Sequence, residues 1–183
     1  MGSYGAVGKG LRLVFLGQIF YILSLFPWIG LLGVVLTLVG LFVAGRGEMR
    51  MKPAFWCCAG EVAATVLQIF RPSDILTVLA LALGVLVIYF ICSVSSVLLE
   101  DLGEIQKANW GRVVWKIYLI GTIIITVLPL ILRSNLYLFW RSRYLLLFIT
   151  LGFRFVFTMI LLLHLYNVYS TFEEQEQSNG GAV

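Results

Sequence analysis

Residues 13–45 form a run of 33 positions without a single Asp, Glu, Lys, Arg or His, bounded by Arg12 and Arg46. A bilayer-spanning helix needs about 20 apolar residues, whereas an apolar stretch of about 10–14 is more typical of a buried core helix. Further apolar runs follow at 75–99, 117–132 and 144–169, the last containing Arg154 and His164. The pattern indicates a multi-pass membrane protein.

The chain has 183 residues, of which 12% are charged, against about 25% in ordinary globular domains. Only helices and closed barrels satisfy their backbone groups in lipid. Barrel strands alternate apolar and polar residues, but residues 75–91 are apolar at both parities. We therefore expect an all-α membrane bundle of about six helices, four to six of them full spans. It would occupy residues 1–172 and be followed by a disordered acidic and polar tail, 173–183.

The first apolar run is too long for one crossing. As a single helix it would extend about 50 Å, whereas the hydrocarbon core is about 30 Å thick. Pro27 lies near its middle, and proline interrupts a helix. We predict a tight hairpin that turns at Pro27 and Trp28, with a first helix from Ala6 and a second over 28–45. The alternative is one long, kinked and tilted span.

The second helix of this hairpin is rich in glycine, at Gly30, Gly33, Gly40 and Gly45. Small residues let helices approach closely in lipid, where packing drives their association. The glycines therefore indicate a packed face. That face meets either another helix of the same chain or, in a homo- or hetero-oligomer, a helix of a partner.

The remaining helices are expected at 54–70, 75–99, 113–132 and 144–169. The segment 54–70 is short, so it either spans fully or is re-entrant. Residues 100–115 are amphipathic and suit the membrane interface. Residues 133–143 combine Arg with aromatic residues, which predicts a loop or a short interfacial helix.

Six helices place both termini on one side. That side carries eight Lys and Arg residues and the other carries four, so the positive-inside rule predicts a cell-membrane protein with both termini in the cytoplasm. The net charge of +4 is explained by these flanks, and the bilayer is the expected partner. The sequence has no basic tract with interleaved aromatic residues of the kind that binds nucleic acid, so we expect no nucleic-acid partner.

Three ionisable residues within the spans are candidates for binding. A charge at the centre of a span costs about 2.5–3.5 kcal/mol on insertion scales, so each needs a reason. Glu61 could bind a cation or proton, Arg154 could bind an anion or pair with Glu61, and His164 could carry a proton. Each residue also has a structural alternative. Glu61 could face water or pair with a base, Arg154 could form a purely structural ion pair, and His164 could be a hydrogen-bonded histidine at the membrane interface.

Catalytic motifs are absent from the sequence. It has no GxSxG, HExxH or Walker loop, and only one histidine, so we expect no enzyme, no cofactor and no metal. Glu100 and Glu104 share a helix face and could hold a divalent cation weakly, although a solvated segment with a pair to Lys107 is the simpler interpretation. The three cysteines lie in apolar stretches and are interpreted as small buried residues.

Three segments of the sequence resemble segments of known membrane proteins. They are the FPWIGLLGVVLTLVGLF hairpin at 26–42, the charged connector before Pro53, and ICSVSSVLLEDLG at 91–103, which leads to the WKIY motif at 115–118. Over roughly residues 10–120 the chain resembles small multi-spanning membrane proteins of Gram-positive bacteria. The resemblance implies a bacterial inner-membrane location and carries no activity.

Two functions fit these features. The first is a small-solute or ion transporter or channel-like protein that uses Glu61 and Arg154, because interrupted helices often frame such sites. The second is a non-catalytic membrane scaffold or accessory subunit. A membrane enzyme would need a second acid or base near Glu61.

Overall fold

The computed structural model describes the backbone of residues 4–22, 27–133 and 136–180. Side chains are described at these residues except at 21–28, 127–147, 150, 154 and 177–180. The described residues form six α-helices and one short 3-10 helix, without strands. These are α1 (Tyr4–Ile22), α2 (Pro27–Gly47), η1 (Met49–Met51), α3 (Lys52–Phe70), α4 (Asp74–Asp101), α5 (Ile105–Arg133) and α6 (Leu136–Gly180). The predicted all-α architecture is confirmed.

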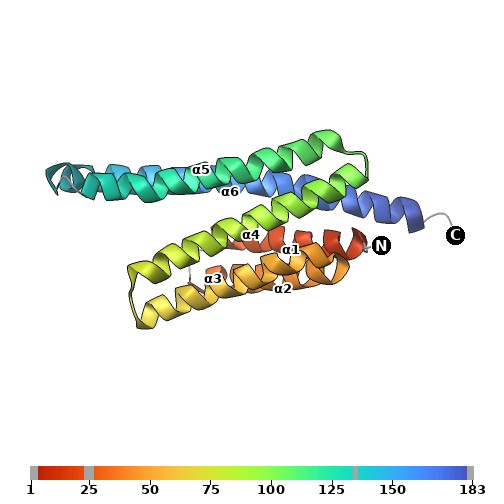
Figure 1. The fold of residues 1–183 in the computed structure, drawn as a ribbon, viewed down its shortest axis with the longest axis horizontal. Helices are drawn as coiled ribbons and strands as arrows, with labels where there is room; N and C mark the ends of the chain where they lie inside the picture. The colour runs from red at the N-terminus through yellow and green to blue at the C-terminus, as the bar shows by residue number, and fades with distance from the viewer. Residues whose placement is uncertain (1–3, 23–26, 134–135, 181–183) are drawn as a thin grey trace.

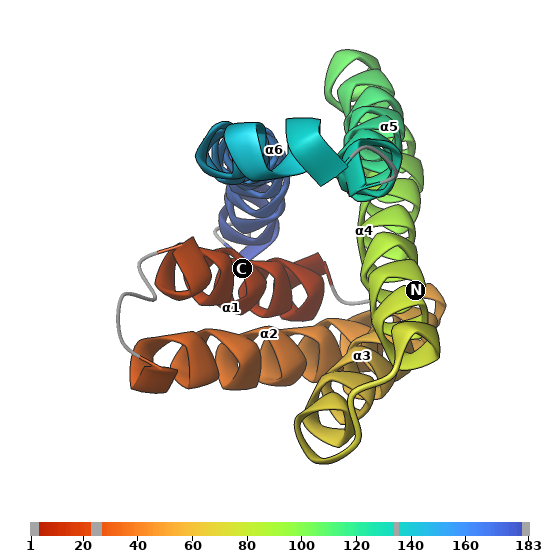
Figure 2. The same cartoon turned by 90° about the vertical axis from the view of Figure 1, so that its left-hand side faces the viewer.

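The helices follow one another around a ring. Each helix packs on its neighbours in the sequence, and α6 packs on α1 to close the circuit (Figure 2). The start of α1 and the end of α6 lie at one end of the bundle, together with the α2–α3 and α4–α5 connections (Figure 1). We call this the terminal end. The opposite end, where α3 turns into α4, is the distal end.

Buried side chains concentrate in the half of the bundle nearest the terminal end. The core consists of Val7, Leu11, Val14, Leu41, Ala44, Met51, Ala54, Cys58, Val87, Ile88, Ile91, Cys92, Val94, Leu98, Leu99, Ala108, Val114, Leu161, Leu165, Val168 and Phe172. By contrast, residues 75–86 of α4 and the described side chains of 148–160 in α6 are all at least partly exposed. The helix pairs diverge toward the distal end, where α5 and α6 form an arm separate from α3 and α4 (Figures 1 and 2).

The predicted hairpin of the first two helices is confirmed, and glycine explains its closeness. A Cβ atom placed on Gly40 would lie 2.6 Å from the carbonyl oxygen of Gly10, and one on Gly17 would lie 2.6 Å from that of Gly33. The two backbones therefore touch directly at points seven residues apart on each helix. Gly45 lies at the α2–α3 connection, where an added Cβ would be 3.3 Å from Cγ of Lys52.

The α4–α5 turn is closed by a glycine in the left-handed region. Gly103 has a φ of +82°. Its N–H donates to Glu100 O, and the N–H of Glu104 donates to Leu99 O, both at 2.9 Å. This is the Schellman pattern that ends a helix. The chain then re-enters a helix at once, so α5 begins at Ile105 and includes most of the predicted interfacial segment 100–115.

The last helix is longer than the sequence indicates. We predicted a loop or a short helix at 133–143 and a disordered tail at 173–183, but α6 runs from Leu136 to Gly180. Part of the reason lies on α1, where Lys9 and Arg12 form ion pairs with Glu176 and Glu173. These carboxylates are therefore held against a neighbouring helix, which favours continuation of α6.

Four helical segments are long and apolar enough to cross a membrane, among the residues that the structure describes. They are Ile29–Gly47, Met49–Phe70, Asp74–Asp101 and Leu151–Glu176. The chain is therefore an all-helical protein with the composition of a multi-pass membrane protein.

Candidate functional site

Glu61 lies in the contact between α3 and α4. The side chain is half-buried, and its carboxylate sits beside Gly84, where an added Cβ would be 3.0 Å from Oε1. Gly60, the preceding residue, packs closely on Leu83 of α4. The absence of a side chain at Gly84 leaves the space that the carboxylate occupies. Glu61 is thus positioned by helix packing inside a candidate span.

A second polar contact joins the same two helices about two turns nearer the distal end. Gln68 Nε2 donates a hydrogen bond to Thr77 Oγ1, and the Thr77 hydroxyl donates to the carbonyl oxygen of Ser73 at 3.2 Å. Because α3 and α4 are antiparallel, this pair continues the line of Glu61 and Gly84 along the helix contact. Sequence analysis did not identify it, since no periodicity relates residues of different helices.

His164 occupies a different place, where α4, α5 and α6 meet. Its side chain is 1% exposed, and Nε2 lies 3.1 Å from Oγ of Ser95. An added Cβ on Gly111 of α5 would lie 2.6 Å from Cε1 of the imidazole. We call His164, Ser95, Ser96 and Gly111 the His164 junction. The imidazole is therefore a hydrogen-bonded group of the packed core, and its height relative to a membrane stays a prediction.

Hydrogen bonds within the junction define how the imidazole is held. The hydroxyls of Ser95 and Ser96 both donate to the carbonyl oxygen of Cys92, at 3.2 and 2.6 Å. With its proton used in this way, Ser95 Oγ accepts from His164, which places the imidazole proton on Nε2. These hydrogen bonds therefore join α4 to α6, while Gly111 of α5 packs against the imidazole.

Arg154 lies in α6, ten residues before His164, and its side chain is outside the described residues. The predicted ion pair between Glu61 and Arg154 therefore also lies outside the described residues. Glu61 and His164 do not converge on one site. Their contact residues on α4, Gly84 and Ser95, are eleven positions apart, which corresponds to about 16 Å along a helix.

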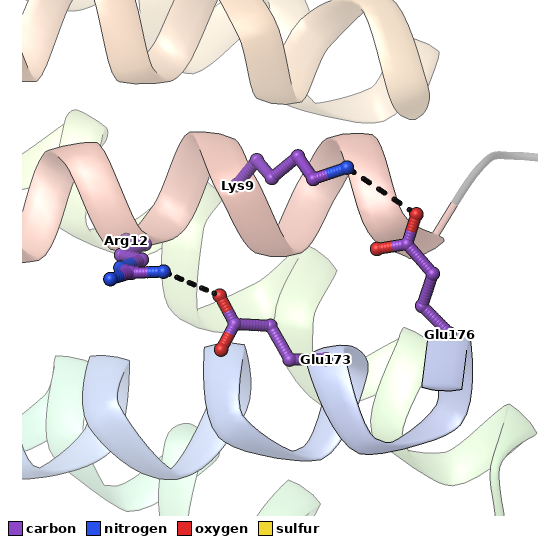
Figure 3. A network of polar contacts seen from close by, with 4 residues as sticks. All are labelled: Lys9, Arg12, Glu173 and Glu176. Carbon is purple, nitrogen blue, oxygen red and sulfur yellow. Dashed lines mark hydrogen bonds and ion pairs between the residues drawn. The ribbon is translucent and has the colours of Figure 1, made fainter. Parts of the chain in front are cut away.

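Ion pairs tie the helices together at the terminal end. Lys9 Nζ lies 3.4 Å from Oε1 of Glu176, and Arg12 Nη1 lies 3.3 Å from Oε1 of Glu173 (Figure 3). Both pairs join α1 to α6 and so close the helix ring. Nothing in the sequence indicates them, because more than 160 residues separate the partners.

The acidic cluster before α5 is also paired. Glu104 Oε2 lies 3.5 Å from Lys107 Nζ, as the simpler interpretation of the sequence predicted, and Glu100 pairs with Arg112. Lys107 donates a further bond of 3.0 Å to Oγ1 of Thr171 on α6. The two carboxylates thus have separate cationic partners.

Metal-ligating residues do not gather within the part of the chain that the structure describes, where His, Cys, Asp and Glu form no group of three. Cys58 and Cys92 are buried and Cys57 is half-buried, all three with unpaired thiols. Comparison with known proteins gives no relative: no family model, no curated protein and no solved structure matches the chain.

Proposed function

We propose that the chain is a non-catalytic membrane scaffold or accessory subunit. The observation that carries this proposal is the use of its intramembrane polar groups as helix-to-helix contacts. His164 bonds to Ser95 in a core with 1% exposure of the histidine, and Gln68 bonds to Thr77 across the α3–α4 contact. Polar side chains used in this way fix the arrangement of helices in lipid.

The diverging distal half supplies the surface for a partner. On α6, Phe148 is 71% exposed and Leu151 is 55% exposed, and Ile123 on α5 is 53% exposed. Most of the described side chains of this arm are at least partly exposed. We infer that another membrane-embedded helix packs against it, because the described side chains of α5 and α6 offer apolar faces there.

A glycine on this arm supports the same conclusion. Gly40, Gly84 and Gly111 each lie in close contact with a neighbouring helix, whereas an added Cβ on Gly152 would have no neighbour within 4 Å. Small residues allow close helix approach. Gly152 is therefore available to a helix that does not belong to this chain.

Photo-crosslinking in native membranes tests the proposal. A photoreactive residue in place of Leu151 is expected to give a discrete protein adduct, and Gly152→Ile is expected to abolish it without unfolding the chain, because the site is open. The matched control carries the photoreactive residue at Val78, which is 62% exposed on α4. Adducts with lipid alone at both positions would contradict the proposal.

A transporter or channel-like function is the second candidate, and the placement of Glu61 favours it. A carboxylate inside an apolar span, beside a glycine that leaves it room, is the kind of group that proton or cation pathways use. Arg154 and His164 would be further members of such a pathway. The test is dissipation of a proton or potassium gradient by proteoliposomes.

If the chain conducts, wild-type vesicles should lose the gradient faster than empty ones, and Glu61→Gln should slow this loss at least tenfold. Glu104→Gln is the matched control, since it removes a carboxylate at the terminal end, outside the candidate spans. Wild-type vesicles that leak no faster than empty ones would eliminate transport of these ions and leave the scaffold.

The orientation and location form part of the same proposal. We propose that the terminal end faces the cytoplasm of a bacterial cell membrane. The eight Lys and Arg residues counted for that side, against four for the other, support it through the positive-inside rule. An oligomer through 28–45 would use the exposed side of α2, because Gly33 and Gly40 face α1.

A further inference from the structure

The connection between α2 and α3 carries an excess of positive charge. Arg46, Arg50 and Lys52 are all exposed within seven residues that contain a single acidic residue, Glu48. Glu48 pairs with Arg50, at 3.8 Å to Nε, and also accepts from the Arg50 backbone N–H at 3.2 Å. Its charge is therefore directed at one of the three cations.

Four of the other five cations counted for the terminal end have carboxylate partners, and Lys116 on α5 is the exception among the described side chains. Lys9, Arg12, Lys107 and Arg112 each pair with a glutamate of another turn or helix. Among the side chains that the structure describes, no carboxylate lies within 4.0 Å of the charged atoms of Arg46 or Lys52. The α2–α3 connection is thus a place where positive charge is left for an external anion.

An aromatic group marks the level of this connection relative to the apolar surface. The rings of Phe42 and Phe55 are 5.8 Å apart, and those of Phe55 and Trp56 are 5.2 Å apart. Trp56 is 70% exposed. Trp and Tyr favour the headgroup level of a membrane, so the exposed Trp56 indicates a membrane boundary at this height, with Phe42 and Phe55 packed beside it.

The backbone positions of Arg46 and Lys52 lie one helical turn outside that level on the two helices. Arg46 follows Phe42 by four residues and its guanidinium sits over the ring, 5.6 Å from the centroid. Lys52 precedes Trp56 by the same four residues, which is about one helical turn. Positive charge directly outside an aromatic layer meets the phosphates of the lipid headgroups.

We propose that Arg46, Arg50 and Lys52 form a binding site for the headgroup of an anionic phospholipid in the leaflet at the terminal end. Guanidinium groups bind phosphate oxygens in a bidentate manner, and lysine adds a compact charge. Met49, 74% exposed between these cations, and Trp56 provide the apolar contacts beneath the headgroup. The site binds phosphatidylglycerol in preference to phosphatidylcholine, because only the former has a net negative charge.

The test uses the purified full chain in a nonionic detergent, titrated with phosphatidylglycerol or phosphatidylcholine and followed by native mass spectrometry. Each cation near a membrane surface contributes about fivefold in affinity for anionic lipid. The variant Arg46→Gln/Arg50→Gln/Lys52→Gln is therefore expected to bind phosphatidylglycerol about a hundredfold more weakly, with its binding of phosphatidylcholine unchanged.

The matched control is Lys9→Gln/Arg12→Gln/Lys107→Gln, which removes the same charge from residues with glutamate partners. Its affinity for phosphatidylglycerol should stay within about threefold of wild type. Equal losses in both triple variants would show general electrostatic attraction and overturn the site. Equal binding of the two lipids by wild type would overturn it as well.

Single variants keep the test valid if the triple variant fails to fold. Arg46→Gln and Lys52→Gln change exposed side chains, and each is expected to weaken phosphatidylglycerol binding about fivefold without altering the unfolding temperature of the lipid-free protein. If neither single variant weakens binding, the proposal is wrong.

Discussion

Replacement of Gly40 by alanine tests the direct backbone contact of α1 and α2. The added Cβ would lie 2.6 Å from the Gly10 carbonyl oxygen and 2.8 Å from the backbone nitrogen of Val14. Ordinary contact for such an atom begins at about 3.4 Å, so the helices would have to separate by roughly 0.8 Å. Neither partner is a flexible side chain that could move aside.

The expected magnitude follows from two opposing effects. Overpacking of a well-packed contact costs about 1–3 kcal/mol, whereas alanine gains up to about 1 kcal/mol over glycine in a helix interior. For Gly40→Ala the contact dominates, since backbone atoms on a second helix are displaced. We expect the free energy of unfolding to fall by about 1–2 kcal/mol.

Gly152→Ala is the matched control on α6. With no neighbour within 4 Å of the added atom, only the gain in helix propensity remains, and the variant should be as stable as wild type or up to about 1 kcal/mol more stable. Both variants are compared by reversible unfolding in mixed micelles of increasing dodecyl sulfate content. If Gly40→Ala is stabilised as much as Gly152→Ala, the close approach of α1 and α2 is refuted.

Three further predictions concern other contacts. Ser95→Ala removes the hydroxyl that accepts from His164, and an unsatisfied buried donor should lower the free energy of unfolding by about 1–3 kcal/mol; Ser95→Ala/His164→Leu should recover part of this loss in the same micelle titration. Lys9→Glu should lower the free energy of unfolding by at most about 1 kcal/mol, because the ion pair of Lys9 with Glu176 is exposed. The double variant Lys9→Glu/Glu176→Lys should restore this free energy, and a failure to restore it would show that the pair is not formed. A fluorescent reporter fused after Val183 should be bright in the cytoplasm, and an alkaline phosphatase fused there should be inactive; the reverse result would invert the proposed orientation.

The sequence predicts the helices well because each one depends on local composition. The charge-free run 13–45 exceeds the length of one crossing, and Pro27 lies near its middle, which together predict the hairpin that the structure shows. Glycine spacing on the second helix indicates a packed face, and Gly33 and Gly40 do lie against α1. These features need no knowledge of any distant segment.

Contacts between distant helices are what sequence reasoning misses. Glu173 and Glu176 were assigned to a disordered tail, because their partners Arg12 and Lys9 are more than 160 residues away. The contact of His164 with Ser95 depends on how α4 and α6 meet, which no local pattern indicates. The room that Gly84 leaves for Glu61 is likewise invisible until the two helices are placed together.

The closed ring of helices has a consequence for the order in which the protein is made. During synthesis each new helix can pack on the one just inserted, because these contacts are between neighbours in the chain. The contact of α6 with α1 is different, since it joins the first helix to the last. Until α6 emerges, the side of α1 around Gly8 that later receives Phe172 stays uncovered in the membrane. Closure of the helix ring therefore waits for α6, and a nascent chain that stops before α6 presents an unfinished surface to the quality-control machinery of the cell.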